Sequence, residues 1–94
     1  MLATLACALT MAMPLAAETL SGKITMVDPA HKLVVVEPSD GVLFDMVVTA
    51  KTRIKAGDQA IALKDLTREM NRTVSVRFNP ERRGDVATSI QVNG

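Results

Sequence analysis

The feature that most constrains this chain is the recurrence of apolar residues at every second position, in short stretches that begin near residue 20. A period of two puts successive side chains on opposite sides of an extended strand, so each stretch predicts a strand with one buried face. The stretches are separated by clusters of Gly, Pro, Asp and Asn, which favour turns. The chain therefore predicts an all-β fold, a barrel of five or six short strands.

The expected strands follow one another closely. The first begins at residue 20 and is ended by Asp28 and Pro29, since proline has no N–H to donate to a sheet. Gly57 suits the first position of a two-residue type II′ turn, which predicts a small hairpin. The other expected segments are strands at 33–36, 42–49, 52–56, 59–63, 74–78 and 86–92, one helical turn at 63–70 and a polar turn at 79–84.

Strands that each carry one apolar face must bury those faces against one another. In a single domain of this length, a closed or nearly closed barrel achieves this and removes exposed sheet edges. We expect residues 18–94 to form a small OB-like β-barrel whose core contains Leu20, Ile24, Met26, Val34 or Val35, Phe44, Met46, Val48, Ile54, Leu63, Leu66, Val74, Val76, Ile90 and Val92.

Residues 1–17 are apolar or small, and Glu18 is the first charged residue. An apolar run followed by Pro14 and then small residues is typical of a cleaved secretory signal, with the cut expected after Ala17 and Ala16 as the next choice. A positive segment at the start is missing. A buried N-terminal helix is the alternative, and the true start lying upstream of Met1 is another.

Cys7 follows Thr-Leu-Ala, which resembles the lipobox of bacterial lipoproteins. Lipidation of Cys7 would anchor the chain to the envelope, whereas cleavage after Ala17 would leave a chain with no cysteine. We expect a periplasmic or secreted protein, with a lipid-anchored envelope protein as the alternative.

Composition excludes several classes of function. The 11 Lys and Arg against 10 Asp and Glu give a net charge of +1. Such a charge does not indicate binding to nucleic acid or to an anionic membrane. One His, no Trp and no Tyr leave little for catalysis or for stacking against bases. The Asp residues are scattered over turns and outward strand positions, so they predict no paired acid and base and no enzyme.

The order of turns and core positions resembles small exported bacterial OB-like β-barrels of unknown function. The resemblance runs from Gly22-Lys-Ile and Leu33-Val-Val-Val through Leu63-Lys-Asp-Leu to Ala87-Thr-Ser-Ile, and covers residues 19–92. Where that family usually has a glycine, this chain has Asn71, which tolerates a left-handed conformation. The resemblance implies a fold and no catalytic residues.

A second, weaker resemblance is to periplasmic copper chaperones of the CusF type, which hold Cu(I) or Ag(I) with a His and two Met thioethers capped by a Trp. It implies Met26, His31 and Met46 as the only candidate metal ligands here. The chain has no Met-x-Met pair and no Trp. The residues themselves predict Met26 and Met46 in the core and His31 exposed in a turn, hence no metal site, no cofactor and weak or absent Cu(I) binding.

The C-terminal half is locally basic, with Arg68, Arg72, Arg77, Arg82 and Arg83. This is either a solvated surface or a contact for an anionic glycan, lipid or partner protein. The leading hypothesis is a non-enzymatic exported barrel that binds an envelope protein or small ligand and no nucleic acid. A Cu(I)- or Ag(I)-binding chaperone is the alternative.

Overall fold

The computed structural model describes residues 18–82 and 84–93. The expected signal peptide at residues 1–17, with the Cys7 lipidation and Ala17 cleavage hypotheses, lies outside the described residues. Within the described part of the chain, no helix is both long enough and apolar enough to cross a bilayer.

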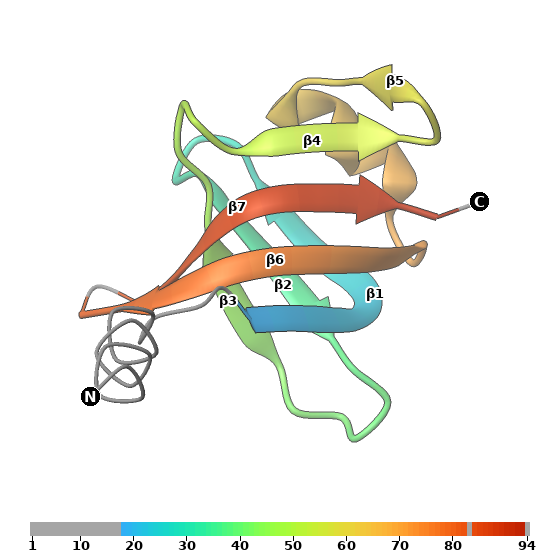
Figure 1. The fold of residues 1–94 in the computed structure, drawn as a ribbon. Coiled ribbons are helices and arrows are strands. Elements are labelled where there is room, and N and C mark those ends of the chain that lie inside the picture. Colours follow the sequence, from blue (N-terminus) through green and yellow to red (C-terminus); the bar gives the residue numbers. More distant parts are fainter. Residues whose placement is uncertain (1–17, 83, 94) are drawn as a thin grey trace, which may run out of the picture.

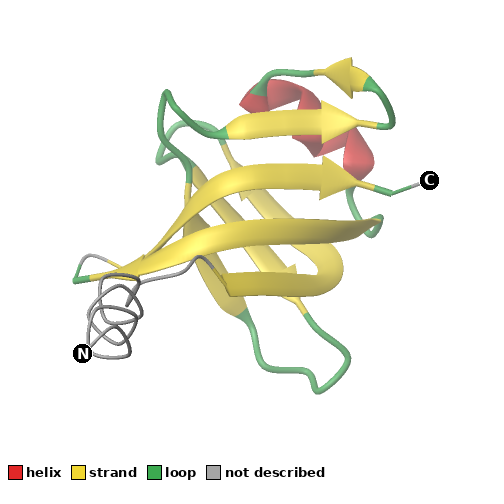
Figure 2. Ribbon diagram, in the orientation of Figure 1, coloured by secondary structure: helices red, strands yellow, loops and turns green. Residues whose placement is uncertain are grey.

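The described residues form seven strands and one short 3₁₀ helix (Figures 1 and 2). In chain order these are β1 (Glu18–Asp28), β2 (Leu33–Glu37), β3 (Phe44–Val47), β4 (Arg53–Ala56), β5 (Gln59–Ala60), η1 (Leu63–Glu69), β6 (Thr73–Glu81) and β7 (Gly84–Val92).

The sheet closes on itself. Its strand order is β3-β2-β1-β6-β7-β4-β5, and β3 also pairs in parallel with β7 through Met46↔Asp85 and Val47↔Val86. Five strands thus close a barrel, while β4 and β5 extend the sheet beyond β7 (Figure 1). This confirms the expected small OB-like barrel with one short helical segment.

Strand β1 belongs to both halves of the barrel. Its residues 18–23 pair with β6 and its residues 23–28 pair with β2. At the change of partner, a Cβ on Gly22 would lie 2.6 Å from the carbonyl oxygen of Glu37. Glycine is therefore required there, because any larger residue would push the chain leaving β2 away from β1.

A β-bulge follows in the same strand. Ile24 pairs with Val36, but Met26 pairs with Val35, so Thr25 is an extra residue on β1, and its Oγ1 donates to the Val35 carbonyl oxygen at 3.3 Å. One inserted residue reverses which side chains face the core from that point on. The placement of Met26 in the core is therefore wrong: Met26 is 44% exposed, and Val27 packs against the core in its place.

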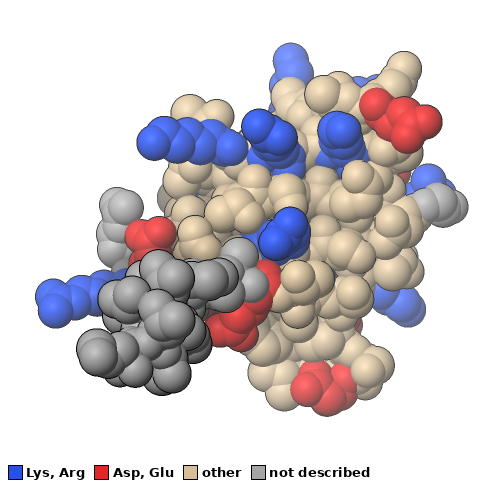
Figure 3. All heavy atoms as spheres, in the orientation of Figure 1, with Lys and Arg blue, Asp and Glu red and all other residues tan. Residues whose placement is uncertain are grey.

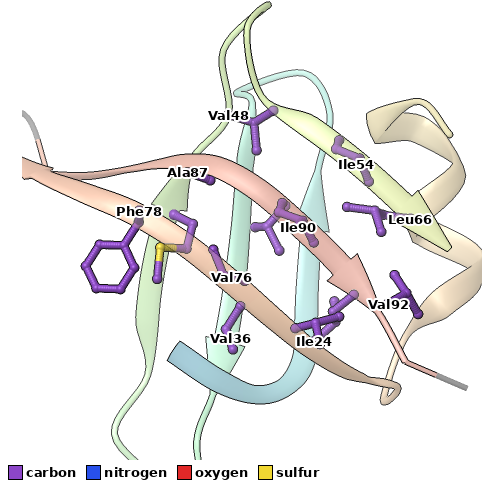
Figure 4. Close-up of a cluster of buried hydrophobic side chains, with 13 residues drawn as sticks. Ile24, Val36, Val48, Ile54, Leu66, Val76, Phe78, Ala87, Ile90 and Val92 are labelled. Atoms are coloured by element: carbon purple, nitrogen blue, oxygen red, sulfur yellow. The ribbon is translucent and has the colours of Figure 1, made fainter. Parts of the chain in front are cut away.

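The core lies inside the barrel and is capped by η1 (Figure 4). Most of the expected core residues are confirmed as buried, and Val34 rather than Val35 belongs to the core cluster. Leu20, Phe44 and Leu63 are only partly buried against it. The core cluster is Ile24, Val34, Val36, Met46, Val48, Ile54, Leu66, Val74, Val76, Phe78, Ala87, Ile90 and Val92.

Several turns differ in extent from expectation. The strand expected at 42–49 is shortened to β3, which leaves Val42 and Leu43 exposed in the preceding loop. The expected polar turn at 79–84 is largely strand, because β6 continues to Glu81 and β7 starts at Gly84. Two backbone expectations are confirmed, since Asn71 has a φ of 68° and Gly57 a φ of 60°.

Candidate functional site

The outer side of the barrel carries apolar side chains where β1, β2, β3 and β7 lie next to one another. We call this surface the apolar face and define it as Met26, Leu33, Val35, Val47 and Val86. Two rows of paired residues build it: Met26–Val35–Asp45 and Asp28–Leu33–Val47–Val86. Each row crosses neighbouring strands about 5 Å apart, so its side chains lie side by side.

These residues alternate with core residues and therefore point away from the core. Val34, Val36 and Met46 are fully buried. Leu33, next to Val34, and Val47, next to Met46, are half-buried. Val35 is 7% exposed although it is outside the core cluster, so its neighbours on the outer side cover it. Met26, opposite Val35, is the most exposed member. The result is an apolar strip on the outside of the barrel with Asp28 and Asp45 at its borders.

His31 lies in the β1–β2 turn at the end of this strip. Its Nδ1 is 2.8 Å from Asp28 Oδ2, and its backbone N–H donates to Asp28 Oδ1 at 3.2 Å. These two contacts hold the pKa of the Asp28 carboxyl below its ordinary value. The His31 side chain is 76% exposed, as the sequence predicted.

The structure does not bring the three candidate metal ligands together. Met46 is fully buried in the core, whereas Met26 lies on the outer side of the same wall of the barrel. His31 is near the strand that carries Met26, but one of its ring nitrogens contacts Asp28. In residues 18–82 and 84–93, no group of three or more His, Cys, Asp or Glu side chains is placed to hold a metal ion.

A surface hollow of about 440 Å³ adjoins the apolar face at Val86. It lies between the loop after β3 and the strands β6 and β7, and is bordered by Lys51, Asn79, Glu81 and Thr88 among others. Its size is within the range of small-molecule sites, and its lining combines Ala50, Val86 and Ala87 with these polar side chains. Chemically, the apolar face and this hollow offer burial to an apolar surface and hydrogen bonds at its rim.

Sequence reasoning missed the apolar face, although one signal for it was present. Leu33-Val34-Val35-Val36 is an unbroken apolar run, and such a run belongs to a strand that is covered on both sides. Alternation alone predicts a strand with one buried side here. Val47 next to Val48, at the end of β3, carries the same signal.

The fold is similar to that of solved structures of CusF. A tryptophan-to-alanine variant of Escherichia coli CusF with Cu(II) superposes with a TM-score of 0.63 and 12% identity, over 84% of this chain and 94% of that chain. Apo-CusF from Escherichia coli superposes with a TM-score of 0.62 and 11% identity, over 87% of this chain and 93% of that chain. CusF with Ag(I) superposes with a TM-score of 0.60 and 12% identity, over 82% of this chain and 97% of that chain.

No family model matches the chain, and no curated protein matches it either. At 11–12% identity the likeness to CusF concerns the fold. The chain therefore shares the small OB-like barrel of CusF, as the weaker of the two sequence resemblances predicted.

Proposed function

We propose that this protein is a non-enzymatic exported barrel that binds a partner protein or small ligand in the bacterial cell envelope through the apolar face. The observation that carries the proposal is the bulge in β1, which turns Met26 outward beside Val35. The bulge exposes the thioether of Met26 at a position that regular alternation would bury, and Val27 packs against the core instead. A binding partner that covers Met26 would account for the exposed position that the bulge gives this side chain.

The position of the face supports the same proposal. OB domains use the outer side of their second and third strands, with the adjoining loops, to bind ligands. In this chain that side is β2 and β3, and the β1–β2 turn with His31 and Asp28 borders it. Surfaces of this kind, apolar with a polar rim, mark interaction sites in soluble proteins.

Export is supported by the sequence of residues 1–17, an apolar run that ends in small residues before the first charge. The mass of the protein recovered from the envelope tests this part. We expect a chain that begins near Glu18. A soluble cytoplasmic protein that retains residues 1–17 would contradict export, and a lipid mass on a chain beginning at Cys7 would establish the lipoprotein instead.

Binding is tested by placing a photo-reactive amino acid at Met26 in cells, with Lys64 as the matched control because it is exposed on η1 away from the apolar face. We expect adducts from position 26 and none from position 64. The adducted molecule is then identified and titrated with purified Val47→Asp and Lys64→Asp variants. We expect Val47→Asp to weaken binding by about tenfold or more and Lys64→Asp to leave it unchanged. Equal adducts at both positions, or equal affinities, would contradict the proposal.

A Cu(I)- or Ag(I)-binding chaperone is the second candidate, favoured by the fold shared with Ag(I)-loaded CusF and by the outward Met26 near His31. Against it, the second thioether, Met46, is enclosed in the core. We expect anaerobic competition with a Cu(I) chelator to show weak or no binding. Stoichiometric binding at micromolar or tighter affinity, lost in both His31→Ala and Met26→Leu, would make the protein a metal carrier.

A further inference from the structure

A second outer surface of the barrel is polar and basic, in contrast to the apolar face. Strands β4, β7, β6 and the first half of β1 lie next to one another at the front of the barrel in Figure 1. Figure 3 shows Lys and Arg side chains gathered over this sheet, with Asp and Glu toward its edges. We call it the basic face and define it as Arg53, Lys55, Arg77, Thr19, Ser21, Ser75, Ser89 and Gln91.

Strand register assembles this face from distant parts of the sequence. One row reads Arg53–Ser89–Arg77–Thr19 across β4, β7, β6 and β1, and the next reads Lys55–Gln91–Ser75–Ser21. All these residues alternate with core residues such as Ile54, Ile90 and Val76, so they point outward. Three cations and five hydroxyl or amide side chains thus share one outer surface of the barrel.

The two rows contain no carboxylate. Within residues 18–82 and 84–93, the three ion pairs are His31–Asp28, Arg68–Asp65 and Arg72–Glu69, and none involves a cation of the basic face. The whole chain has a net charge of +1, whereas these two rows carry three cations and no carboxylate. Clustered cations of this kind attract anions.

The structure corrects the expectation of one basic surface in the C-terminal half. Arg68 lies on η1 and Arg72 follows it, both beside acidic partners, and Arg82 lies beyond the end of β6. Of that set, Arg77 is the residue that joins the basic face. Its neighbours there, Arg53 and Lys55, come from a different part of the sequence.

We propose that the basic face binds an anionic polysaccharide. Arg53 and Lys55 are about 7 Å apart along β4, and Arg53 and Arg77 are separated by two strand spacings of about 10 Å in total. An extended sugar chain with acidic groups at intervals can lie across such a surface. Arg and Lys would pair with its carboxylate or sulfate groups, and the Ser and Thr hydroxyls would bond to its hydroxyls.

Gln91 adds an amide oxygen, which can only accept hydrogen bonds, to the hydroxyls and cations of this face. Its Nε2 donates to the carbonyl oxygens of Gly57 and Val92 at 2.9 and 3.2 Å, which directs that amide nitrogen toward the backbone. Its Oε1 remains to accept a hydrogen bond. Sugar hydroxyls donate such bonds, whereas a fully ionised phosphate or sulfate group only accepts them, so Gln91 favours a saccharide over a bare polyanion.

Two other polyanions fit less well. Single-stranded nucleic acid is bound by stacking on aromatic side chains, and both Phe44 and Phe78 lie in or against the core. An anionic membrane is bound by cations combined with inserted apolar side chains. The large apolar residues exposed in the described chain, Met26, Val42, Leu43 and Met70, come from none of β4, β6 and β7.

The test is a titration of the purified protein with a fluorescently labelled alginate oligosaccharide, a polymer of uronic acids. The test variant is Lys55→Gln with Arg77→Gln. The matched control is Lys64→Gln with Arg68→Gln, which removes the same two charge types from η1. Thermal melts establish that both variants are folded, and a Gln91→Ala variant tests the acceptor.

We expect saturable binding that weakens by about tenfold in the test variant and less than about twofold in the control. Equal losses in the two variants would mean diffuse charge attraction and would overturn the proposal, as would the absence of binding. Tighter binding of single-stranded DNA or of anionic lipid vesicles than of alginate would overturn the choice of a polysaccharide. The apolar face is not involved, so a failure of the proposed function leaves this test intact.

Discussion

The apolar face and the basic face are built from the same kind of alternating strand, yet they present opposite chemistry. On β2 and β3 the outward positions are mostly apolar, as in Leu33, Val35 and Val47. In the two rows of the basic face, on β4, β6 and the second half of β7, the outward positions are charged, hydroxyl or amide side chains. Both faces enclose one core, so fold stability does not demand the difference. The outward positions are where this barrel is free to acquire function.

Strand β1 separates the two faces within its own length. Its first half contributes Thr19 and Ser21 to the basic face, and its second half contributes Met26 to the apolar face. Gly22 and the bulge at Thr25 lie between them. The change in chemistry along β1 therefore coincides with a change in pairing partner.

The largest expected effect separates the two methionines. Met46 is fully buried, so Met46→Ala leaves a cavity and should lower the free energy of unfolding by about 2–5 kcal/mol. Met26 lies on the apolar face, and Met26→Ala should cost less than about 1 kcal/mol. Urea melts measure both values. Equal losses would mean that Met26 is a core residue and that the apolar face lacks its most exposed member.

The next largest loss of stability is expected at Gly22, where β1 changes its pairing partner from β6 to β2. Gly22→Ala places a Cβ against the Glu37 carbonyl group, which belongs to backbone and cannot rotate away, so we expect a loss of about 1–3 kcal/mol. The neighbouring Ser21→Ala removes an exposed hydroxyl and serves as the control, with a change within about 0.5 kcal/mol. Chemical denaturation of both variants checks the difference. A neutral Gly22→Ala would show that β1 and β2 do not approach closely there.

The smallest expected effect is a pH dependence of stability that comes from Asp28, at the border of the apolar face. His31 lowers the pKa of Asp28, so ionised Asp28 adds stability above the ordinary carboxyl pKa, and this stability is lost as the pH falls through the lowered pKa. In His31→Ala the pKa of Asp28 should rise toward its ordinary value. Asp65, whose pKa is lowered by the Ala62 N–H and by Arg68, is the internal control and should not move. Carboxyl carbon NMR titrations follow both groups, and an unchanged Asp28 would contradict the pairing.

Much of the fold could be predicted because turns and alternation act locally. Asp28-Pro29 ends β1 and Gly57 opens the small hairpin, both for reasons contained in a few residues, and the family resemblance predicted the left-handed Asn71. The alternation of Phe44, Met46 and Val48 against Asp45 likewise predicted which side of β3 faces the core, because that strand has no irregularity, although β3 is shorter than expected.

The candidate sites could not be predicted in the same way. The bulge at Thr25 arises where β1 leaves β6 and turns onto β2, a long-range event with no local signature, and it reversed the side on which Met26 lies. The basic face depends on the register that sets Arg53, Ser89 and Arg77 in one row across three strands. Composition alone showed only a balanced charge.

Residue-resolved NMR tests most directly whether the two faces are separate binding surfaces. The isotope-labelled protein is titrated with alginate oligosaccharide, and amide shifts are followed at both faces. We predict shifts at Arg53, Lys55, Arg77, Ser89 and Gln91, with Met26, Leu33, Val35 and Val47 unchanged. Shifts centred on the apolar face, or spread evenly over both, would contradict the division of this barrel into two chemically distinct faces.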